Sequence, residues 1–253
     1  MTTAETTREI YNSQAAKWSR DEPSLLSDFS ARPFLLDLCT PVTEKRVLDL
    51  GCGEGYVSRE LMKRGARTTL GIDISEEMIQ AAIRQQEHIR YDGLDYCVAD
   101  LRQDTSPIDK SYDLIIAVFL FNYMSVDEMH QIMQLAYERL VPGGRLIFSV
   151  PHPSLPFLKT PEFPFYFEPR GGYFSGRDRC FPGEIWRLDR TPVDVQCVHK
   201  LFSDYFSGLK QAGFTTIPDV HELRIDERHV ALDSDFFRPL VDLPLHMAME
   251  VTK

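Results

Sequence analysis

An aspartate and three glycines at alternate positions occupy the stretch LDLGCGEG, residues 48–55. Glycines in this spacing leave the backbone bare, so a ligand can lie directly against it. A dinucleotide site favours G-x-G-x-x-G, whose third glycine lets strand and helix pack closely beneath a pyrophosphate. Tyr56 stands at that third position here, and Asp49 precedes the glycines. The pattern therefore suits an uncharged or cationic group better than a diphosphate.

Two further carboxylates close the next apolar runs. The segment GIDIS ends a run on Asp73, from which a carboxylate can accept both hydroxyl protons of a ribose. The segment VADLRQ carries Asp100, whose oxygen can accept from an adenine amine, while Leu101 offers its backbone amide. Either acid alone could be a helix cap. Together, at the ends of successive runs, they describe a nucleoside site.

These residues need strands that end at a common edge. Short apolar runs recur at residues 46–50, 68–73, 95–100, 112–121 and 144–150. Helical patterns lie between most of them, with Ser75 and Ser125 as N-caps before acidic first turns. Continuous apolar strands that alternate with helices indicate parallel pairing with both faces covered. The sequence predicts an α/β fold with a doubly wound sheet.

Two regions stand apart from this alternation. Residues 1–38 read as helices that precede the first strand. Residues 152–198 lose periodicity and hold seven of the sixteen prolines and nine aromatic residues. Loops this long inside a compact domain are usually functional, and prolines limit the entropy that ordering them costs. We interpret the second region as a substrate lid, and a structural flap over a sheet edge is the alternative.

Composition and charge limit the kinds of molecule that the chain is expected to bind. The chain has 253 residues, of which 43% are hydrophobic and 26% charged, as in an ordinary globular protein. A net charge of −10 without a basic cluster argues against nucleic acid. No apolar run reaches the roughly 18 residues that cross a bilayer, and no secretory signal is visible, so we expect a cytoplasmic protein. Five scattered cysteines and the absence of ligand spacing predict reduced thiols and no metal.

Residues 46–150 resemble the class I S-adenosylmethionine-dependent methyltransferases, specifically the broad bacterial, type 11-like group that acts on small molecules. The matching motifs are VLDLGCGEG, LGIDIS, MIQAA, CVADL, YDLIIAVFLFNYM and LVPGGRLIFSV, in that order. This resemblance implies a Rossmann-like seven-stranded sheet in the order 3-2-1-4-5-7-6. The final strand, in LPLHMAMEVTK, would then insert antiparallel to its neighbour.

The resemblance also implies one methyltransferase domain over residues 1–253 and S-adenosylmethionine as cofactor, with S-adenosylhomocysteine as product. Its parts would be an N-terminal helical cap (1–40), a cofactor-binding core (45–151), a substrate lid insertion (152–198) and the last helix and strands (199–253). The residues that would bind the cofactor are Tyr11, Trp18, Asp49, Gly51, Gly53, Asp73, Ile74, Met78, Asp100, Leu101, Ala117 and Phe119.

Histidines are the candidate proton acceptors. A sulfonium methyl is already activated, so the protein chiefly has to hold the acceptor in line with it. A hydroxyl or ammonium acceptor must still lose a proton, and histidine titrates near neutrality. His152 and His199 flank the aromatic insertion. We hypothesise that one of them, with His199 preferred, is the general base, although buried structural histidines are equally common.

The acceptor pocket should be apolar and aromatic. The predicted substrate-binding residues are Asn122, Tyr123, Phe165, Tyr166, Tyr173 and Trp186. The expected reaction is methyl transfer to oxygen, nitrogen or carbon of a small apolar or aromatic metabolite, with a homodimer left open. Two alternatives remain: a non-catalytic cofactor-binding partner subunit, and a nicotinamide-dependent oxidoreductase. Tyr56, which stands in place of the third glycine of a dinucleotide site, argues against the second.

Overall fold

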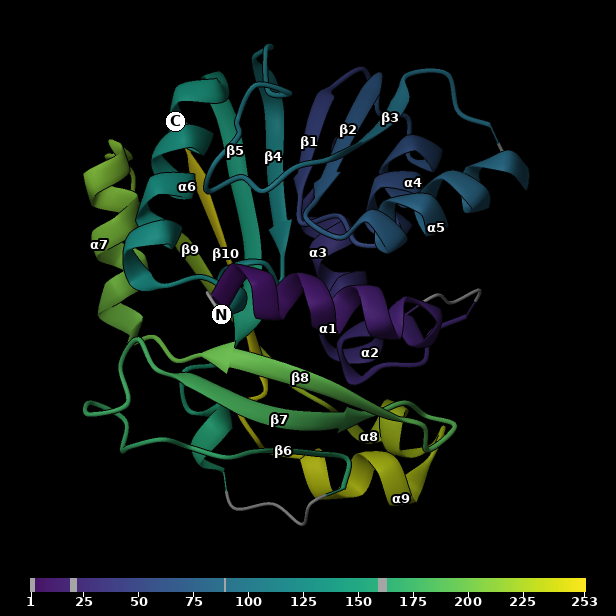
Figure 1. The fold of residues 1–253 in the computed structure, drawn as a ribbon, viewed down its shortest axis with the longest axis vertical. Coiled ribbons are helices and arrows are strands. Elements are labelled where there is room, and N and C mark those ends of the chain that lie inside the picture. Colours follow the sequence, from purple (N-terminus) through teal and green to yellow (C-terminus); the bar gives the residue numbers. More distant parts are fainter. Residues whose placement is uncertain (1–2, 19–21, 89, 159–162) are drawn as a thin grey trace.

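A seven-stranded sheet with helices on both faces forms the body of the chain, and a small three-stranded sheet lies beyond one end of it (Figure 1). The computed structural model describes all residues except 1–2, 19–21, 89 and 159–162. The elements up to the fourth strand are α1 (Thr3–Trp18), α2 (Leu26–Ser30), α3 (Arg32–Leu38), β1 (Arg46–Leu50), α4 (Tyr56–Lys63), β2 (Thr68–Asp73), α5 (Glu76–His88), β3 (Leu94–Val98) and β4 (Tyr112–Val118).

The second half of the chain completes the main sheet and adds the small one. Its elements are η1 (Phe121–Tyr123), α6 (Val126–Arg139), β5 (Leu140–Pro151), η2 (Leu155–Phe157), β6 (Phe165–Phe167), β7 (Cys180–Trp186), β8 (Pro192–Val198), α7 (Phe202–Ala212), β9 (Asp219–Leu223), α8 (Glu227–Val230), α9 (Ser234–Phe237), η3 (Arg238–Leu240) and β10 (His246–Thr252). The helices that the sequence predicted before the first strand are present in the structure as α1, α2 and α3.

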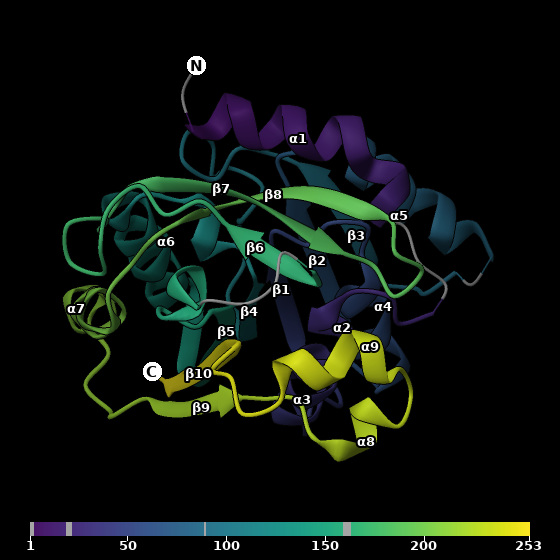
Figure 2. The same ribbon diagram turned by 90° about the horizontal axis from the view of Figure 1, so that it is seen from below.

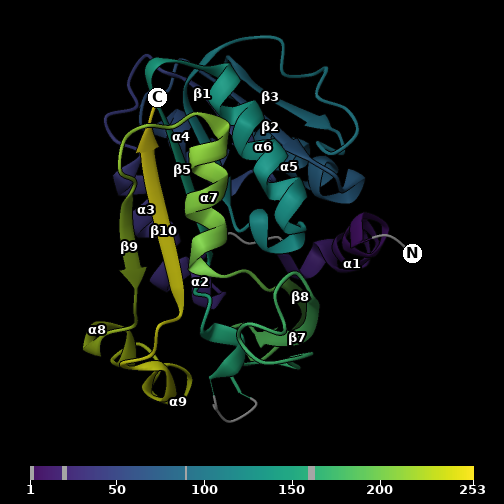
Figure 3. The ribbon, with the colours of Figure 1, turned by 90° about the vertical axis from the view of Figure 1, so that its left-hand side faces the viewer.

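The main sheet has the order β3-β2-β1-β4-β5-β10-β9. Strands β1 to β5 pair in parallel, while β10 runs antiparallel to both β5 and β9. The predicted fold class and strand order are thereby confirmed, since β9 and β10 are the sixth and seventh strands of this sheet. Figure 3 shows β9 as the edge strand beside β10.

Alternation along β1 explains why helices cover both faces. Val47 and Leu48 are both fully buried but belong to different apolar clusters. Leu48 packs with residues of α6 such as Met129, and Val47 packs with residues of α4 such as Leu61. Successive strand side chains point to opposite faces, so a strand that is apolar throughout needs cover on both.

The two serines expected to begin helices do so. Ser125 Oγ accepts from the Glu128 amide at 3.2 Å, and Glu128 Oε2 accepts from the Ser125 amide at 2.6 Å, which is a complete capping box. Ser75 Oγ accepts from the Met78 amide at 3.1 Å. These caps fix the points at which α6 and α5 leave the carboxyl edge of the sheet.

The aperiodic insertion contains regular structure that the sequence pattern did not predict. Strands β6, β7 and β8 form an antiparallel sheet in that order, with Phe181 opposite Cys197 and Ile185 opposite Val193. Pro182 and Gly183 interrupt the apolar pattern of β7 and read as strand breakers. Gly183 is accommodated because β6 approaches closely: a Cβ there would lie 2.5 Å from the Tyr166 carbonyl oxygen.

Helix α1 fastens the small sheet to the body. Gln14 donates to the Asp194 carbonyl oxygen at 3.3 Å and accepts from the Asp194 amide at 3.1 Å, as an additional strand would. Seen from below, α1 runs alongside β8, and α8 and α9 lie on the other side of β6 (Figure 2). In the part of the chain described, no helix combines the length and the apolar character needed to cross a bilayer.

Candidate active site

A cavity opens where the parallel strands of the main sheet end, and the small sheet supplies its opposite wall. Fourteen of the predicted residues line it: Tyr11, Trp18, Asp49, Gly51, Gly53, Asp73, Ile74, Met78, Asp100, Leu101, Phe119, Asn122, Tyr123 and Phe165. The predicted residues that do not line it are Ala117, His152, Tyr166, Tyr173, Trp186 and His199.

The glycine turn after β1 presents bare backbone to this cavity. Gly51 and Gly53 adopt φ values of 70° and 56°, in the left-handed region that favours glycine. A Cβ on Gly53 would meet nothing within 4 Å, so the space in front of it is open. The Gly53 amide donates to Asp73 Oδ2 at 2.9 Å and ties the turn to the end of β2.

Asp73 is oriented by backbone amides at the end of β2. Its Oδ1 accepts from the Ser75 amide at 2.9 Å, and its Oδ2 accepts from Gly53. Burial raises the pKa of the carboxyl above its usual range, and the backbone hydrogen bonds oppose this rise. Each carboxylate oxygen has a second lone pair, so Asp73 can also accept from two hydroxyls.

Asp49 is a buried acid in the wall of the cavity. Its side chain is 1% exposed, and Ser58 Oγ donates to Oδ2 at 2.6 Å. Burial raises the pKa of this carboxyl to about 7, with the nearby charge of Asp73 adding to the rise. A cationic ligand group placed here would favour ionisation of Asp49 and would be held by it.

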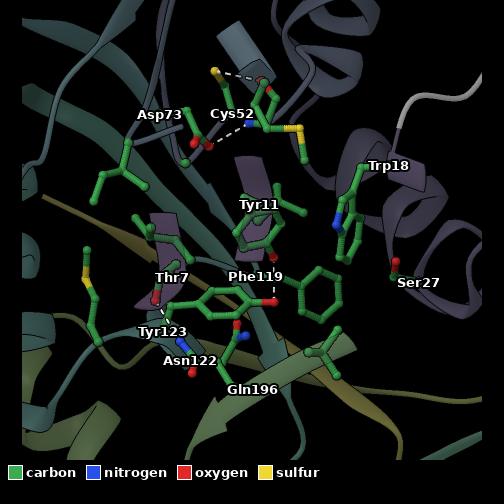
Figure 4. Close-up of a pocket in the computed structure, with 18 of the residues that line it drawn as sticks. Thr7, Tyr11, Trp18, Ser27, Cys52, Asp73, Phe119, Asn122, Tyr123 and Gln196 are labelled. Carbon is green, nitrogen blue, oxygen red and sulfur yellow. Dashed lines mark hydrogen bonds between the residues drawn. The ribbon is translucent and has the colours of Figure 1, made fainter. Parts of the chain in front are cut away.

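Tyr11 of α1 and Tyr123 of η1 lie side by side in the wall of the cavity. Tyr11 Oη donates to Tyr123 Oη at 2.5 Å, and the Tyr11 ring lies 5.2 Å from the Trp18 ring (Figure 4). Burial raises the pKa of Tyr123 to about 12, so this hydroxyl stays protonated.

Two buried polar atoms in the cavity wall lack a partner. In the part of the chain described, neither Trp18 Nε1 nor Asn122 Oδ1 makes a hydrogen bond. Leaving a buried donor or acceptor unsatisfied costs about 1–3 kcal/mol, so each such atom calls for an explanation. A donor and an acceptor left open, together with the open space at Gly53, fit a polar ligand such as a nucleoside carrying an amino acid.

Comparison with known proteins agrees with this geometry. Residues 47–144 match the family described as "Methyltransferase domain". A malonyl-[acyl-carrier protein] O-methyltransferase from Priestia megaterium is 25% identical over 216 residues, which cover 79% of this chain and 74% of that protein. The chain spans about half the length of most of the curated relatives it matches, as with an uncharacterized protein of Haemophilus influenzae, 28% identical over 141 residues and 53% of each chain.

Solved structures show the same fold. An S-adenosylmethionine-dependent methyltransferase from Mesorhizobium loti superposes with a TM-score of 0.64 at 21% identity, over 87% of this chain and 96% of that one. Magnesium protoporphyrin IX methyltransferase from Synechocystis, with bound S-adenosylhomocysteine, gives a TM-score of 0.60 at 19% identity over the whole of both chains. Residues 47–144 of this chain are thus a methyltransferase domain, and the chain has the fold of the solved S-adenosylmethionine-dependent methyltransferases.

The predicted adenine residues of this methyltransferase domain are partly engaged with neighbours. Asp100 Oδ1 accepts from Arg102 Nε at 2.7 Å, and Oδ2 accepts from Gln103 Nε2 at 3.1 Å. Asp100, Leu101 and Arg102 all line the cavity. The resemblance did not assign a role to Arg102, whose guanidinium fixes the orientation of the carboxylate.

The end of β4 is strained where it meets the cavity. Phe119 has a φ of 55°, which is rare for a bulky residue and characteristic of functional sites. Its ring lies 4.9 Å from the ring of His246 and 5.9 Å from the guanidinium carbon of Arg32. Ala117 precedes this bend and is fully buried in the core, so it supports the floor from below.

The two histidines proposed as general base sit in structural contacts. His199 Nε2 bonds the Tyr173 carbonyl oxygen at 2.8 Å, and its ring stacks against Phe181. His152 Nδ1 accepts from the Ser154 amide, and its Nε2 contacts Glu222 Oε1 at 3.1 Å. Burial lowers the pKa of both. Since neither lines the cavity, the structural alternative is favoured, and the catalytic role stays a prediction.

Sequence reasoning missed several residues of the cavity wall. These are Thr7, Ser27, Arg32, Cys52, Glu54, Leu120, Gln196 and His246. Only His246 carried a readable signal: an antiparallel last strand begins at the edge where the parallel strands end, so its first residue must face the cavity. Cys52, Glu54 and Leu120 lie within motifs but were given no role, and Thr7, Ser27, Arg32 and Gln196 come from segments that carry no motif. Among the described residues, no cluster of three metal-binding side chains occurs.

Proposed function

We propose that this chain transfers the methyl group of S-adenosylmethionine to oxygen, nitrogen or carbon of a small apolar or aromatic molecule. One observation carries this proposal: a single cavity joins the polar residues at the strand ends to an apolar wall from the small sheet. Cofactor and acceptor can therefore meet in one enclosed space, which is what an in-line displacement requires.

The polar end would hold the cofactor. Asp73 would accept from the ribose hydroxyls, the bare backbone at Gly53 would lie against the amino-acid portion, and Asp49 would face its ammonium group. Trp18 Nε1 and Asn122 Oδ1 would find partners on the ligand. The sulfonium supplies an electrophilic methyl group, so these residues need only bind, orient and exclude water.

The other end would hold the acceptor. Its apolar lining consists of Leu26, Leu155, Phe165, Phe167 and Ile185. These side chains favour an apolar or aromatic scaffold over a sugar or a nucleotide. A net charge of −10 further supports a small molecule rather than nucleic acid as acceptor.

Binding and turnover test the proposal separately. Calorimetry should show binding of S-adenosylmethionine but not of NAD, with binding lost in Asp73→Ala. Transfer of isotope-labelled methyl into a small-molecule extract, read by mass spectrometry with Asp73→Ala as blank, should label a discrete product. Binding without transfer would favour the non-catalytic partner-subunit alternative, and binding of NAD alone would favour an oxidoreductase.

A further inference from the structure

A short hydrogen-bond chain fixes the orientation of His246 at the start of β10. Ser30 Oγ lies 2.7 Å from His246 Nδ1 and 3.0 Å from the Leu26 carbonyl oxygen, one turn earlier in α2. A carbonyl only accepts, so the Ser30 hydroxyl proton is directed to Leu26. The Ser30 oxygen is then left to accept from Nδ1–H. This arrangement selects the tautomer in which Nε2 carries a bare lone pair.

The bare nitrogen belongs to a ring that lines the acceptor end of the cavity. His246 pairs with Pro151 across the sheet and lies edge to face with Phe119, and both of these residues also line the cavity. Among the described residues, the hydrogen bond that the His246 ring makes is at Nδ1, with Ser30 Oγ. Nε2 is therefore the acceptor atom that the ring offers to a bound molecule.

We propose that His246 Nε2 accepts the proton of the O–H group that is methylated. This inference rests on the proposed function and narrows it. The acceptor oxygen forms a bond to the methyl carbon, the carbon–sulfur bond breaks, and its electron pair leaves on sulfur as a neutral thioether. The proton passes to Nε2, giving an imidazolium that keeps its Nδ1–H bond to Ser30 and then releases the proton to solvent.

The charges around His246 keep it ready for this role. Burial, with the charges of Arg32 from α3 and of His152 from the end of β5, lowers its pKa to about 3. The ring is therefore neutral from pH 5 to 8, and it takes the proton only as bond formation makes the acceptor strongly acidic. The substrate class that follows is a phenol or an alcohol, whose oxygen becomes strongly acidic as it is methylated. An amine would keep its proton as an ammonium, and a carboxylate has no proton to give at neutral pH.

Nitrogen NMR of the S-adenosylhomocysteine-loaded protein tests the geometry without turnover. The His246 resonances should report a protonated Nδ1 and a bare Nε2 at pH 7. Saturating phenol should shift Nε2 by several parts per million, whereas anisole, which lacks the hydroxyl, should not. The opposite tautomer, or equal responses to phenol and anisole, would overturn the proposal.

Variants test the chemistry in the labelled-methyl assay. His246→Asn keeps a donor for Ser30 but removes the atom at Nε2, and His246→Gln serves as a second variant. Both should bind S-adenosylmethionine within twofold of wild type and lose at least about 100-fold in transfer. His229→Asn, away from the cavity, should retain transfer. Transfer by both His246 variants at the wild-type rate would sink the inference and leave the proposed function intact.

A wild-type protein that binds the cofactor and transfers nothing would instead count against the proposed function. The NMR measurements still decide the inference in that case, because they ask whether Nε2 accepts a hydrogen bond from a hydroxyl. The two failures are thus distinguishable. One refutes the proposed methyl transfer, and the other refutes only the role of His246 as the proton acceptor.

Discussion

Replacing Asp49 by asparagine should stabilise the cofactor-free protein at alkaline pH while weakening cofactor binding. Burial raises the pKa of this carboxyl from its ordinary value of 3.8 to about 7. In the unfolded chain it ionises near pH 4, so between pH 4 and 7 the folded state binds more protons. Stability from this group is therefore greatest in acid and falls as pH rises through this window.

The magnitude follows from the same values. A difference of about 3 pH units, at about 1.4 kcal/mol per unit, amounts to about 4 kcal/mol lost by pH 8. About 3 kcal/mol of this loss falls between pH 5 and pH 8. Asparagine is close in shape and can still accept from Ser58 Oγ, which donates to Asp49 at 2.6 Å. The substitution removes the ionisation and keeps the packing.

Urea unfolding at pH 5 and pH 8 measures this effect. The stability advantage of Asp49→Asn over wild type should grow by about 3 kcal/mol between the two pH values. Asp95→Asn, on the exposed side of β3, is the matched control for loss of one carboxylate. Parallel wild-type and Asp49→Asn profiles would show that Asp49 is not held protonated by burial and would refute the reasoning.

The same variant reports on the cofactor. If the ammonium group of S-adenosylmethionine lies against Asp49, binding should ionise the carboxyl and release a proton at pH 6. Calorimetry in buffers of different ionisation enthalpy would detect this proton with wild type. Asp49→Asn should release none and bind at least about tenfold more weakly, since an ion-pair hydrogen bond is worth about 1.5–3 kcal/mol.

Three further outcomes are expected. Gly53→Ala should fold at a cost of about 1–2 kcal/mol for its left-handed backbone, yet bind S-adenosylmethionine at least tenfold more weakly because its methyl occupies the open space; unchanged affinity would place the cofactor elsewhere. His246→Asn should be less destabilised by acid than wild type. The depressed pKa of His246 makes wild type lose about 2 kcal/mol of unfolding free energy as pH falls from 6.5 to 5. Equal losses in the two proteins, measured by urea unfolding, would contradict this. Tyr11→Phe should break the hydroxyl pair with Tyr123, so the cofactor should dissociate faster than it does from wild type. An unchanged dissociation rate in stopped flow would exclude a role for α1 in closing the cavity.

The clustering of the residues predicted to bind the cofactor could be foreseen because each part of that cluster is local in sequence. A strand, a glycine turn and a helix N-terminus are contiguous in sequence, and parallel strands place successive ends at one edge. Gly53, Asp73 and Asp100 therefore line one cavity, as the alternation of elements indicated, and their roles in binding the cofactor stay predictions. The strand order followed from the family resemblance, not from periodicity.

The insertion could not be predicted in the same way. Pro182 and Gly183 sit inside β7, where sequence rules place breaks. They are tolerated because β6 lies against β7 at close range and because α1 supports the outer strand through Gln14. These are contacts between distant segments. The sequence of the insertion by itself does not reveal these contacts. Its aromatic content therefore led to the prediction of a lid and not of a sheet.

The acceptor end shows why a histidine is hard to assign from its position in sequence. His152 and His199 flank the insertion, yet their rings turn into structural contacts with Glu222 and Tyr173. His246 lies far from any motif, but it begins the one antiparallel strand of the main sheet, and that reversal brings its first residue to the edge where parallel strands end. Topology, not proximity in sequence, decides which imidazole lines the cavity.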